Sequence, residues 1–159
     1  GLDGLVPSAS FPIAWPADGA TVLLSYHWGE HPDPLTSCPG YRVPTGLPII
    51  LQIGKGNRIP NVVAHSFMED GAPLQHCVFD ETNYANPSAA EQEGVRKCLD
   101  ARDAIVLVPR DPLTPGSTYA ASMSFNGESY SWSFTVSDFA IAQGSMRRRE
   151  MRLGTAPIP

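Results

Sequence analysis

The feature that most constrains the fold is a hairpin signal late in the chain, where Asn126-Gly127 separates two strand-like runs. Asn-Gly is the favoured pair for a two-residue type I′ turn, because both residues of that turn need positive φ. The flanking runs cover residues 118–125 and 128–136. If Asn126 and Gly127 are the loop, Tyr119 lies opposite Phe134, and the register of the whole pair follows.

Alternation within these two runs gives the hairpin one apolar face and one polar face. Successive side chains of a strand point to opposite faces, and here one of the two sets is mainly serine and threonine. The other set comprises Tyr119, Ala121, Met123, Phe125, Tyr130, Trp132 and Phe134. We expect this set to face a core, in which Tyr119 and Trp132 have structural roles.

A buried strand is predicted just before this hairpin. Residues 104–108 read Ala-Ile-Val-Leu-Val, an apolar and largely β-branched run that predicts a strand buried on both faces. Pro115-Gly116 then predicts a turn three residues ahead of Tyr119. Immunoglobulin-like sandwiches place a tyrosine at this point, with its ring in the core and its hydroxyl bonded to nearby backbone.

The rest of the chain predicts short strands, many turns and one helix. Sixteen prolines and fourteen glycines in 159 residues favour a sandwich over a helical protein. We therefore predict an all-β fold, an immunoglobulin or fibronectin-III-like β-sandwich of roughly seven or eight strands with one short inserted helix at about residues 88–100. Ser88 is the expected N-cap of this helix, and Glu91 stands where it completes a capping box.

Charge and hydropathy limit the partners. Residues 1–136 carry seven basic and fourteen acidic side chains, which argues against a nucleic-acid surface. No apolar run approaches the roughly 20 residues that span a bilayer, so no membrane span is expected. We divide the chain into a linker or edge strand (1–16), the sandwich domain (17–136) and a basic tail (137–159), and expect a monomer. Because the chain begins with Gly1, we expect a processed or excised piece whose missing leader says nothing about export.

The three cysteines lie 39 and 21 residues apart and match no zinc pattern. One disulfide and one free thiol are expected in an exported protein. Val95, Cys98 and Leu99 share a face of the predicted helix, so we expect Cys98 to be a small buried hydrophobe. Cys38 then pairs with Cys77, and the competing pairing is Cys77 with Cys98.

Histidines supply the candidate metal ligands. Strands at residues 61–68 and 73–79 are predicted to form a second hairpin around Asp70-Gly71, which places His65 directly opposite His76. Two imidazoles at that separation can share a metal ion, but their apolar neighbours are typical of a core. A second group of candidate ligands lies in a proline-rich loop. It contains His27 and His31, together with the carboxylates of Glu30 and Asp33.

Two loops carry polar residues for which an ordinary turn is the better interpretation. Asp80, Glu81 and Asn83 offer the oxygen ligands that calcium prefers, but their spacing is not that of an EF-hand. Residues 54–57, Gly-Lys-Gly-Asn, have the composition of a phosphate loop without its length or its following helix. We find no nucleophile elbow, expect no cofactor, and predict that the chain is not an enzyme.

Several aromatic residues lie outside the predicted core stripe. Rings with flat apolar faces and polar tips suit wet binding surfaces, although they can equally seal the ends of a sandwich. The candidate binding aromatics are Trp28, Tyr41 and Tyr84.

Six short segments give the chain a family resemblance over most of residues 11–136. They are Pro-Ala-Asp-Gly-Ala-Thr (16–21), Gly-Glu-His-Pro-Asp-Pro-Leu (29–35), Cys-Pro-Gly-Tyr (38–41), Gly-Leu-Pro-Ile (46–49), His-Cys-Val-Phe-Asp-Glu (76–81) and Leu-Thr-Pro-Gly-Ser-Thr-Tyr (113–119). Together they resemble a segment found beside bacterial secreted CAP domains, the superfamily of cysteine-rich secretory proteins. The last segment also resembles generic bacterial immunoglobulin-like and fibronectin-III-like domains.

The resemblance implies export to the periplasm or the cell exterior and a non-catalytic accessory role beside an upstream CAP domain or a cell-envelope component. The histidine and glutamate motifs of the CAP domain itself are absent, so its cavity function does not carry over. We therefore expect an accessory or interaction module. The two alternatives are a periplasmic copper- or zinc-binding module and a carbohydrate-binding module of the cell envelope.

Overall fold

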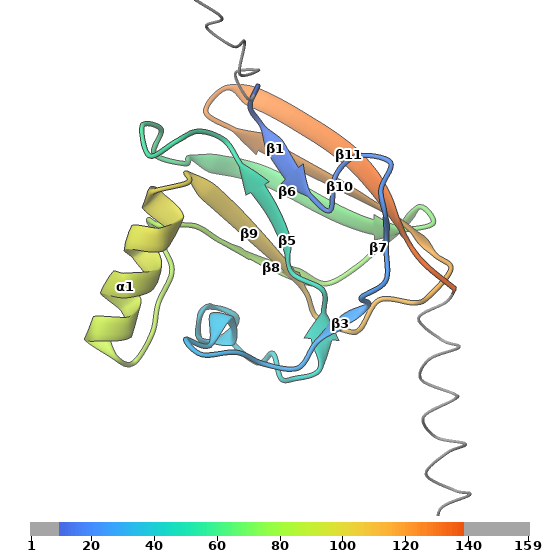
Figure 1. Cartoon of the computed structure of the whole chain (residues 1–159), viewed down its shortest axis with the longest axis horizontal. Coiled ribbons are helices and arrows are strands. Elements are labelled where there is room, and N and C mark those ends of the chain that lie inside the picture. The colour runs from blue at the N-terminus through green and yellow to red at the C-terminus, as the bar shows by residue number, and fades with distance from the viewer. Residues whose placement is uncertain (1–9, 139–159) are drawn as a thin grey trace, which may run out of the picture.

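The computed structural model describes residues 10–138, and the predicted hairpin forms the middle of its larger sheet (Figure 1). β10 (Thr118–Phe125) and β11 (Glu128–Val136) pair with Tyr119 opposite Phe134. Asn126 and Gly127 have φ values of 47° and 76°, as a type I′ turn requires. The predicted hairpin and its register are both confirmed.

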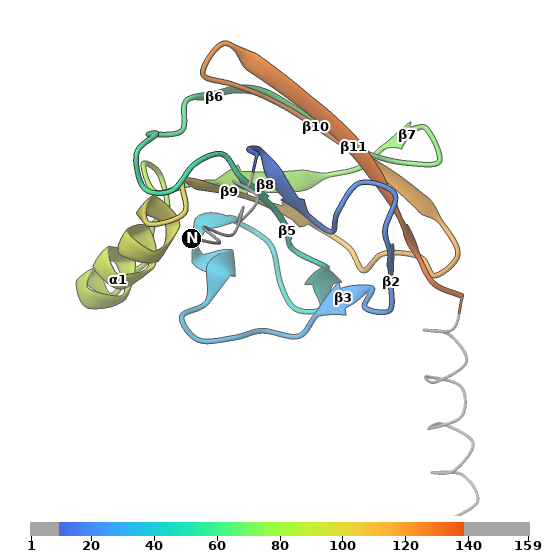
Figure 2. The same ribbon diagram turned by 45° about the horizontal axis from the view of Figure 1, so that its top comes forward.

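Two sheets stack face to face (Figure 2). The five-stranded sheet has the order β2-β11-β10-β6-β7, which adds β2 (Thr21–Val22), β6 (Val62–Glu69) and β7 (Ala72–Pro73). The four-stranded sheet has the order β1-β5-β9-β8, from β1 (Ile13–Trp15), β5 (Ile49–Gln52), β9 (Ala104–Pro109) and β8 (His76–Phe79). A small third sheet joins β3 (Tyr26–His27) to β4 (Thr45–Gly46). The all-β sandwich is confirmed, and seven of the eleven strands described here have three or more residues.

Aromatic rings fill the space between the two sheets. Phe67 of β6 stacks on Tyr119 with ring centroids 5.4 Å apart, and Tyr119 stacks on Phe134 at 5.6 Å. Trp132 is also buried, with 4% of its surface exposed. The apolar face of the hairpin is therefore core, and Tyr130, at the margin of this cluster, is only partly buried.

β9 separates two apolar clusters, because both of its faces are covered. Ile105 and Leu107 point into the core between the sheets, whereas Val106 and Val108 belong to a second cluster. This second cluster lies beneath α1 (Ala89–Asp100) and the short 3-10 helix η1 (Pro34–Ser37). Leu35 of η1 is part of the cluster. The prediction of a strand buried on both faces is confirmed.

The inserted helix begins as predicted. The Ser88 side chain caps it by accepting the backbone N–H of Glu91, at 3.4 Å. Glu91 does not complete the capping box, since the N–H of Ser88 donates to the side chain of Asn86 instead.

The expectation that Cys98 is buried is wrong, because its thiol is free and exposed. The partly buried stripe of α1 contains Gln92, Val95, Arg96 and Leu99. At about 100° per residue, Cys98 lies at the margin of this stripe rather than within it.

Two stretches of the chain are divided between sheets. Residues 21–27 contain both β2 and β3, which pair with different partners. In the second hairpin, Asp70 and Gly71 form the predicted turn between β6 and β7. After β7 the chain crosses to the other sheet, where β8 pairs with β9. His65 and His76 are therefore not cross-strand neighbours.

The described residues include parts of both predicted flanking segments, the linker or edge strand (1–16) and the basic tail (137–159). β1 lies at the edge of the four-stranded sheet, paired with β5 alone. The predicted basic tail lies outside the described residues, apart from Ser137 and Asp138. No helix within residues 10–138 is long and apolar enough to cross a membrane.

Candidate functional site

An exposed apolar surface surrounds β3. Trp28 is 66% exposed and Tyr26 is 47% exposed, and their rings meet edge to face with centroids 6.2 Å apart. Val43 lies beside the next residue along the chain, because its Cγ1 is 3.5 Å from where a Cβ on Gly29 would lie. We define the Trp28 surface as the exposed side chains Leu23, Leu24, Tyr26, Trp28 and Val43.

The small β3–β4 sheet orients this surface. Alternation along the extended chain turns Tyr26 and Trp28 outward and His27 inward, since successive side chains point to opposite sides. On the partner strand β4, Thr45 lies opposite His27 and is fully buried. A Cβ on Gly46 would collide with Pro109 at the end of β9, so only glycine lets β4 approach the body this closely. The aromatic pair therefore stands on a strand pair that packs closely against the body.

The other two predicted binding aromatics are not on this surface. Tyr84 is fully buried, and its hydroxyl donates to the carbonyl of Asp33 at 3.0 Å. Its ring is structural, because it anchors the start of η1 from below. Tyr41 is partly buried under the guanidinium of Arg110, 5.8 Å from the ring centroid. Burial raises the pKa of the Tyr41 hydroxyl, and Arg110 partly offsets this effect.

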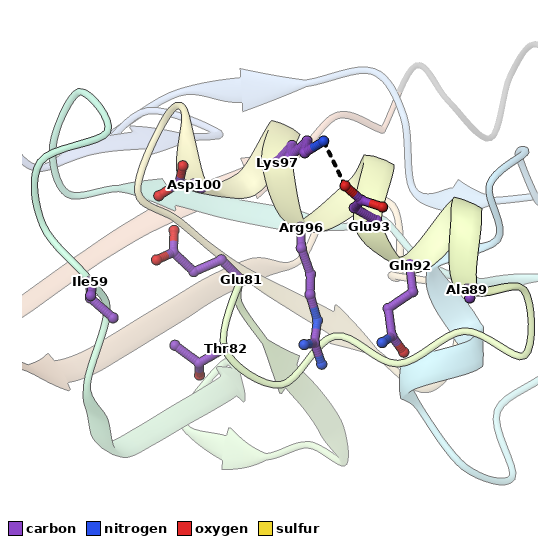
Figure 3. A pocket seen from close by; sticks show the side chains of 9 residues that line it. All are labelled: Ile59, Glu81, Thr82, Ala89, Gln92, Glu93, Arg96, Lys97 and Asp100. Atoms are coloured by element: carbon purple, nitrogen blue, oxygen red, sulfur yellow. Dashed lines mark ion pairs between the residues drawn. The ribbon is translucent and has the colours of Figure 1, made fainter.

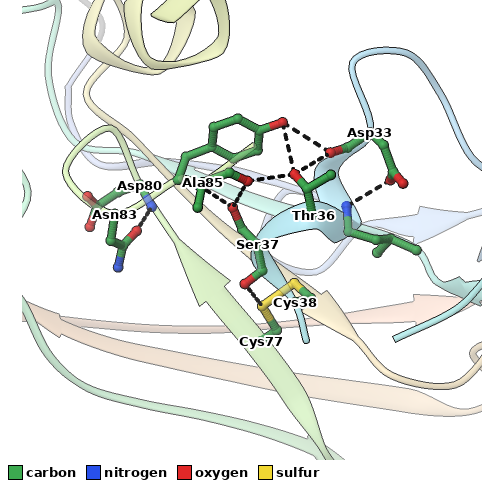
Figure 4. Close-up of a disulfide and its surroundings, with 10 residues drawn as sticks. Asp33, Thr36, Ser37, Cys38, Cys77, Asp80, Asn83 and Ala85 are labelled. Atoms are coloured by element: carbon green, nitrogen blue, oxygen red, sulfur yellow. Dashed lines mark hydrogen bonds between the residues drawn. A yellow bond between two sulfur atoms is a disulfide. The ribbon is translucent and has the colours of Figure 1, made fainter. Parts of the chain in front are cut away.

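The predicted Cys38–Cys77 disulfide is present and joins the end of η1 to β8, with Cα atoms 5.7 Å apart (Figure 4). Its surroundings are tied down by side-chain hydrogen bonds. Ser37 Oγ donates to the carbonyl of Ala85 at 3.1 Å and accepts the N–H of the same residue at 2.7 Å. The bridge therefore fastens the proline-rich loop to the sandwich.

The histidine pair forms across the two sheets rather than along one of them. His65 Nδ1 of β6 lies 2.7 Å from His76 Nε2 of β8. His76 Nδ1 is 2.8 Å from the carbonyl of Leu74, which accepts only, so His76 Nε2 is the acceptor from His65 when both rings are neutral. Burial, followed by the proximity of His76, lowers the pKa of His65.

The other two predicted metal ligands lie elsewhere. His31 has 80% of its side chain exposed and places Nε2 3.1 Å from a carboxylate oxygen of Glu91. His27 is partly buried at β3. In the part of the chain that the structure describes, no group of three metal-ligating side chains includes a histidine. The structure thus brings together two of the four histidines, and metal binding by them stays a prediction.

The acidic loop after β8 behaves partly as expected. Asp80 and Asn83 form a turn, in which Asn83 Oδ1 accepts the N–H of Asp80 at 2.8 Å (Figure 4). Glu81, however, joins Asp100 and Asp103 in a group of three carboxylates that we name the acidic cluster. Sequence reasoning missed this group, because Asp100 ends α1 and Asp103 follows it, and only the fold brings them to Glu81.

No protein-family model matches the chain, and no curated protein matches it significantly. Fold and sites together define a disulfide-linked β-sandwich with one inserted helix, an exposed aromatic surface and an acidic cluster.

Proposed function

We propose that this chain is a non-catalytic interaction module of an exported bacterial protein and that the Trp28 surface is its binding face. The observation that carries the proposal is the exposure of large apolar side chains within a short segment of the chain, with Trp28 at 66% and Leu24 at 59%, and the contact between the rings of Tyr26 and Trp28. Contiguous exposed apolar patches mark interaction sites on folded proteins. Tryptophan and tyrosine are also the residues that most often dominate binding energy at interfaces.

Strand order supports an immunoglobulin-like character for the module. An immunoglobulin fold has strands A, B, E and D in one sheet and C, F and G in the other. When the main strands are lettered in chain order, β1-β5-β9-β8 becomes A-B-E-D and β11-β10-β6 becomes G-F-C. Tyr119 then lies at the start of strand F, and its hydroxyl accepts the N–H of Thr114 at 2.6 Å, as in a tyrosine corner. This fold hosts many unrelated functions, so the binding role rests on the Trp28 surface and not on the strand order.

Two observations support export. The Cys38–Cys77 disulfide is of the kind that persists in oxidising compartments such as the periplasm or the cell exterior. The resemblance to segments beside secreted CAP domains points the same way and suggests a CAP domain or an envelope component as the partner.

The aromatic pair favours one further candidate, a carbohydrate of the cell envelope. Tyr26 and Trp28 present two amphipathic rings to solvent, and such rings pack against the apolar faces of sugars while their polar tips stay hydrated. The Trp28 surface suits either a protein partner or a carbohydrate, and a binding experiment distinguishes the two.

Binding of the purified chain to isolated peptidoglycan, to a glycan array and to a purified bacterial CAP domain tests the proposal. We expect the chain to bind one of these three ligands, and Trp28→Ala should weaken that binding by more than about tenfold. Trp15→Ala is the matched control, because Trp15 is 46% exposed on the edge strand β1 and lies outside the Trp28 surface. Equal binding by both variants, or loss in Trp15→Ala alone, would contradict the proposal.

A further inference from the structure

The acidic cluster has the dimensions of a cation site. Glu81, Asp100 and Asp103 each offer one carboxylate oxygen, and these oxygens all lie within 4.8 Å of one another. Two oxygens bound to the same calcium ion at about 2.3–2.6 Å are at most about 5 Å apart, so all three fit around one ion. Figure 3 shows the carboxylates of Glu81 and Asp100 facing each other across the gap between the acidic loop and the end of α1.

Asp103 adds an observation that is independent of the clustering. It is 1% exposed, and its Oδ2 accepts three backbone N–H groups, those of residues 56, 57 and 58, each at 3.0 Å. Its other oxygen, Oδ1, is buried with no partner among the described residues, and the same is true of Glu81 Oε2. Buried acceptors without a donor are costly to folding, so two of them in one cluster favour a cation at this point.

Three basic side chains near the cluster pair with other groups. Lys97 forms an ion pair with Glu93 at 2.7 Å and Arg96 donates to the carbonyl of Tyr84 at 2.8 Å (Figure 3 shows the Lys97–Glu93 pair). Arg58 donates to Glu128 at 2.6 Å. Asp100 is also the last residue of α1, where the helix dipole places partial negative charge. The local field therefore favours a cation.

We propose that the acidic cluster binds one calcium ion. Three carboxylates form a hard, all-oxygen ligand set of the kind that selects calcium over zinc or copper. The cluster opens onto a pocket of about 460 Å³, lined by Glu81, Thr82 and Asp100 among others, through which water completes the coordination. The ion joins the acidic loop, the end of α1 and, through Asp103, the turn at residues 56–58. This assignment departs from the expectation of no cofactor drawn from the sequence.

Without the ion, the carboxylates repel one another. Burial, and then the charges of Asp100, Asp103 and Asp80, raise the pKa of Glu81. Glu81→Gln removes one of these charges and keeps the side-chain shape. The variant should therefore be more stable than the wild type when calcium is absent and should no longer respond when calcium is added.

The test is thermal unfolding and titration calorimetry of the full chain after treatment with a chelator. At a calcium concentration about 100-fold above the Kd, we expect the Tm of the wild type to rise by about 5–10 °C, with one ion bound per chain. Glu81→Gln and Asp100→Asn should each lose this shift. Glu93→Gln is the matched control, because Glu93 lines the same pocket but pairs with Lys97, and it should keep the shift.

Magnesium and zinc test whether the site is specific for calcium. Magnesium should give a smaller Tm shift than calcium, since it demands shorter and near-octahedral coordination. Absence of calorimetric calcium binding at millimolar concentration, or a shift that persists in Glu81→Gln, would overturn the proposal. Tighter binding of zinc that is lost in His65→Ala and kept in Glu81→Gln would also overturn it, by placing the metal site at the histidine pair. None of these outcomes bears on the Trp28 surface, which is tested separately.

Discussion

Tyr119 combines a packing role and a hydrogen-bonding role in one side chain. Its ring is fully buried, while its hydroxyl accepts the N–H of Thr114 at 2.6 Å and donates to Glu69 Oε1 at 3.0 Å. Burial alone would raise the pKa of Glu69, but hydrogen bonds that include the one from Tyr119 outweigh it and lower this pKa. The hydroxyl therefore holds the turn before β10 against the end of β6.

Tyr119→Phe should keep the packed ring and leave the Thr114 N–H without this acceptor. We expect the free energy of unfolding to fall by about 1–2 kcal/mol, measured by urea denaturation. Tyr130→Phe is the control, because Tyr130 lies at the margin of the core and is only partly buried, and its effect should stay within about 0.5 kcal/mol. Equal effects of the two substitutions would show that the corner contributes nothing through its hydroxyl.

At the scale of elements, the disulfide determines how firmly the proline-rich loop is held. Cys38 and Cys77 are 39 residues apart in sequence, and closing a loop of this length removes chain entropy worth about 4 kcal/mol from the unfolded state. Cys38→Ser with Cys77→Ser should lower the stability by an amount of that order. Cys98→Ser, which alters an exposed free thiol, should leave the urea midpoint unchanged. A double variant as stable as the wild type would mean that η1 and β8 are held by their other contacts alone.

Elements specified by local sequence were predictable, whereas those specified by the other sheet were not. The Asn126-Gly127 turn fixes its own strands, and Ser88 caps its own helix, so both were found from the sequence. The crossing from β7 to β8 depends on which sheet has room for β8, and no nearby residue signals it. The burial of Tyr84 likewise depends on Asp33, 51 residues earlier in the chain. The acidic cluster escaped detection for the same reason.

On the scale of the whole molecule, the histidine pair links the two sheets at a point where they are not hydrogen-bonded to each other. His65 belongs to the five-stranded sheet and His76 to the four-stranded sheet, and their rings meet at 4.9 Å between centroids. A proton on both rings would replace their hydrogen bond by repulsion between two cations. This polar contact between the sheets is therefore lost when both rings carry a proton.

The sign of the pH dependence follows from the lowered pKa of His65, whose ordinary value is 6.5. The stabilisation is fully present above pH 6.5, because both the folded and the unfolded chain then carry a neutral ring. As the pH falls below 6.5, the unfolded chain takes up a proton that the folded chain resists, and stability is lost down through the folded pKa. When the pH is lowered from 7.5 to 5, the Tm of His65→Gln should therefore fall by less than the Tm of the wild type. Both are measured with a chelator present. Val63→Thr, on the same strand and 73% exposed, should keep the wild-type pH dependence. If His65→Gln followed the wild-type curve, the pair would not couple the sheets to pH, and the acid sensitivity of the sandwich would have to come from its carboxylates.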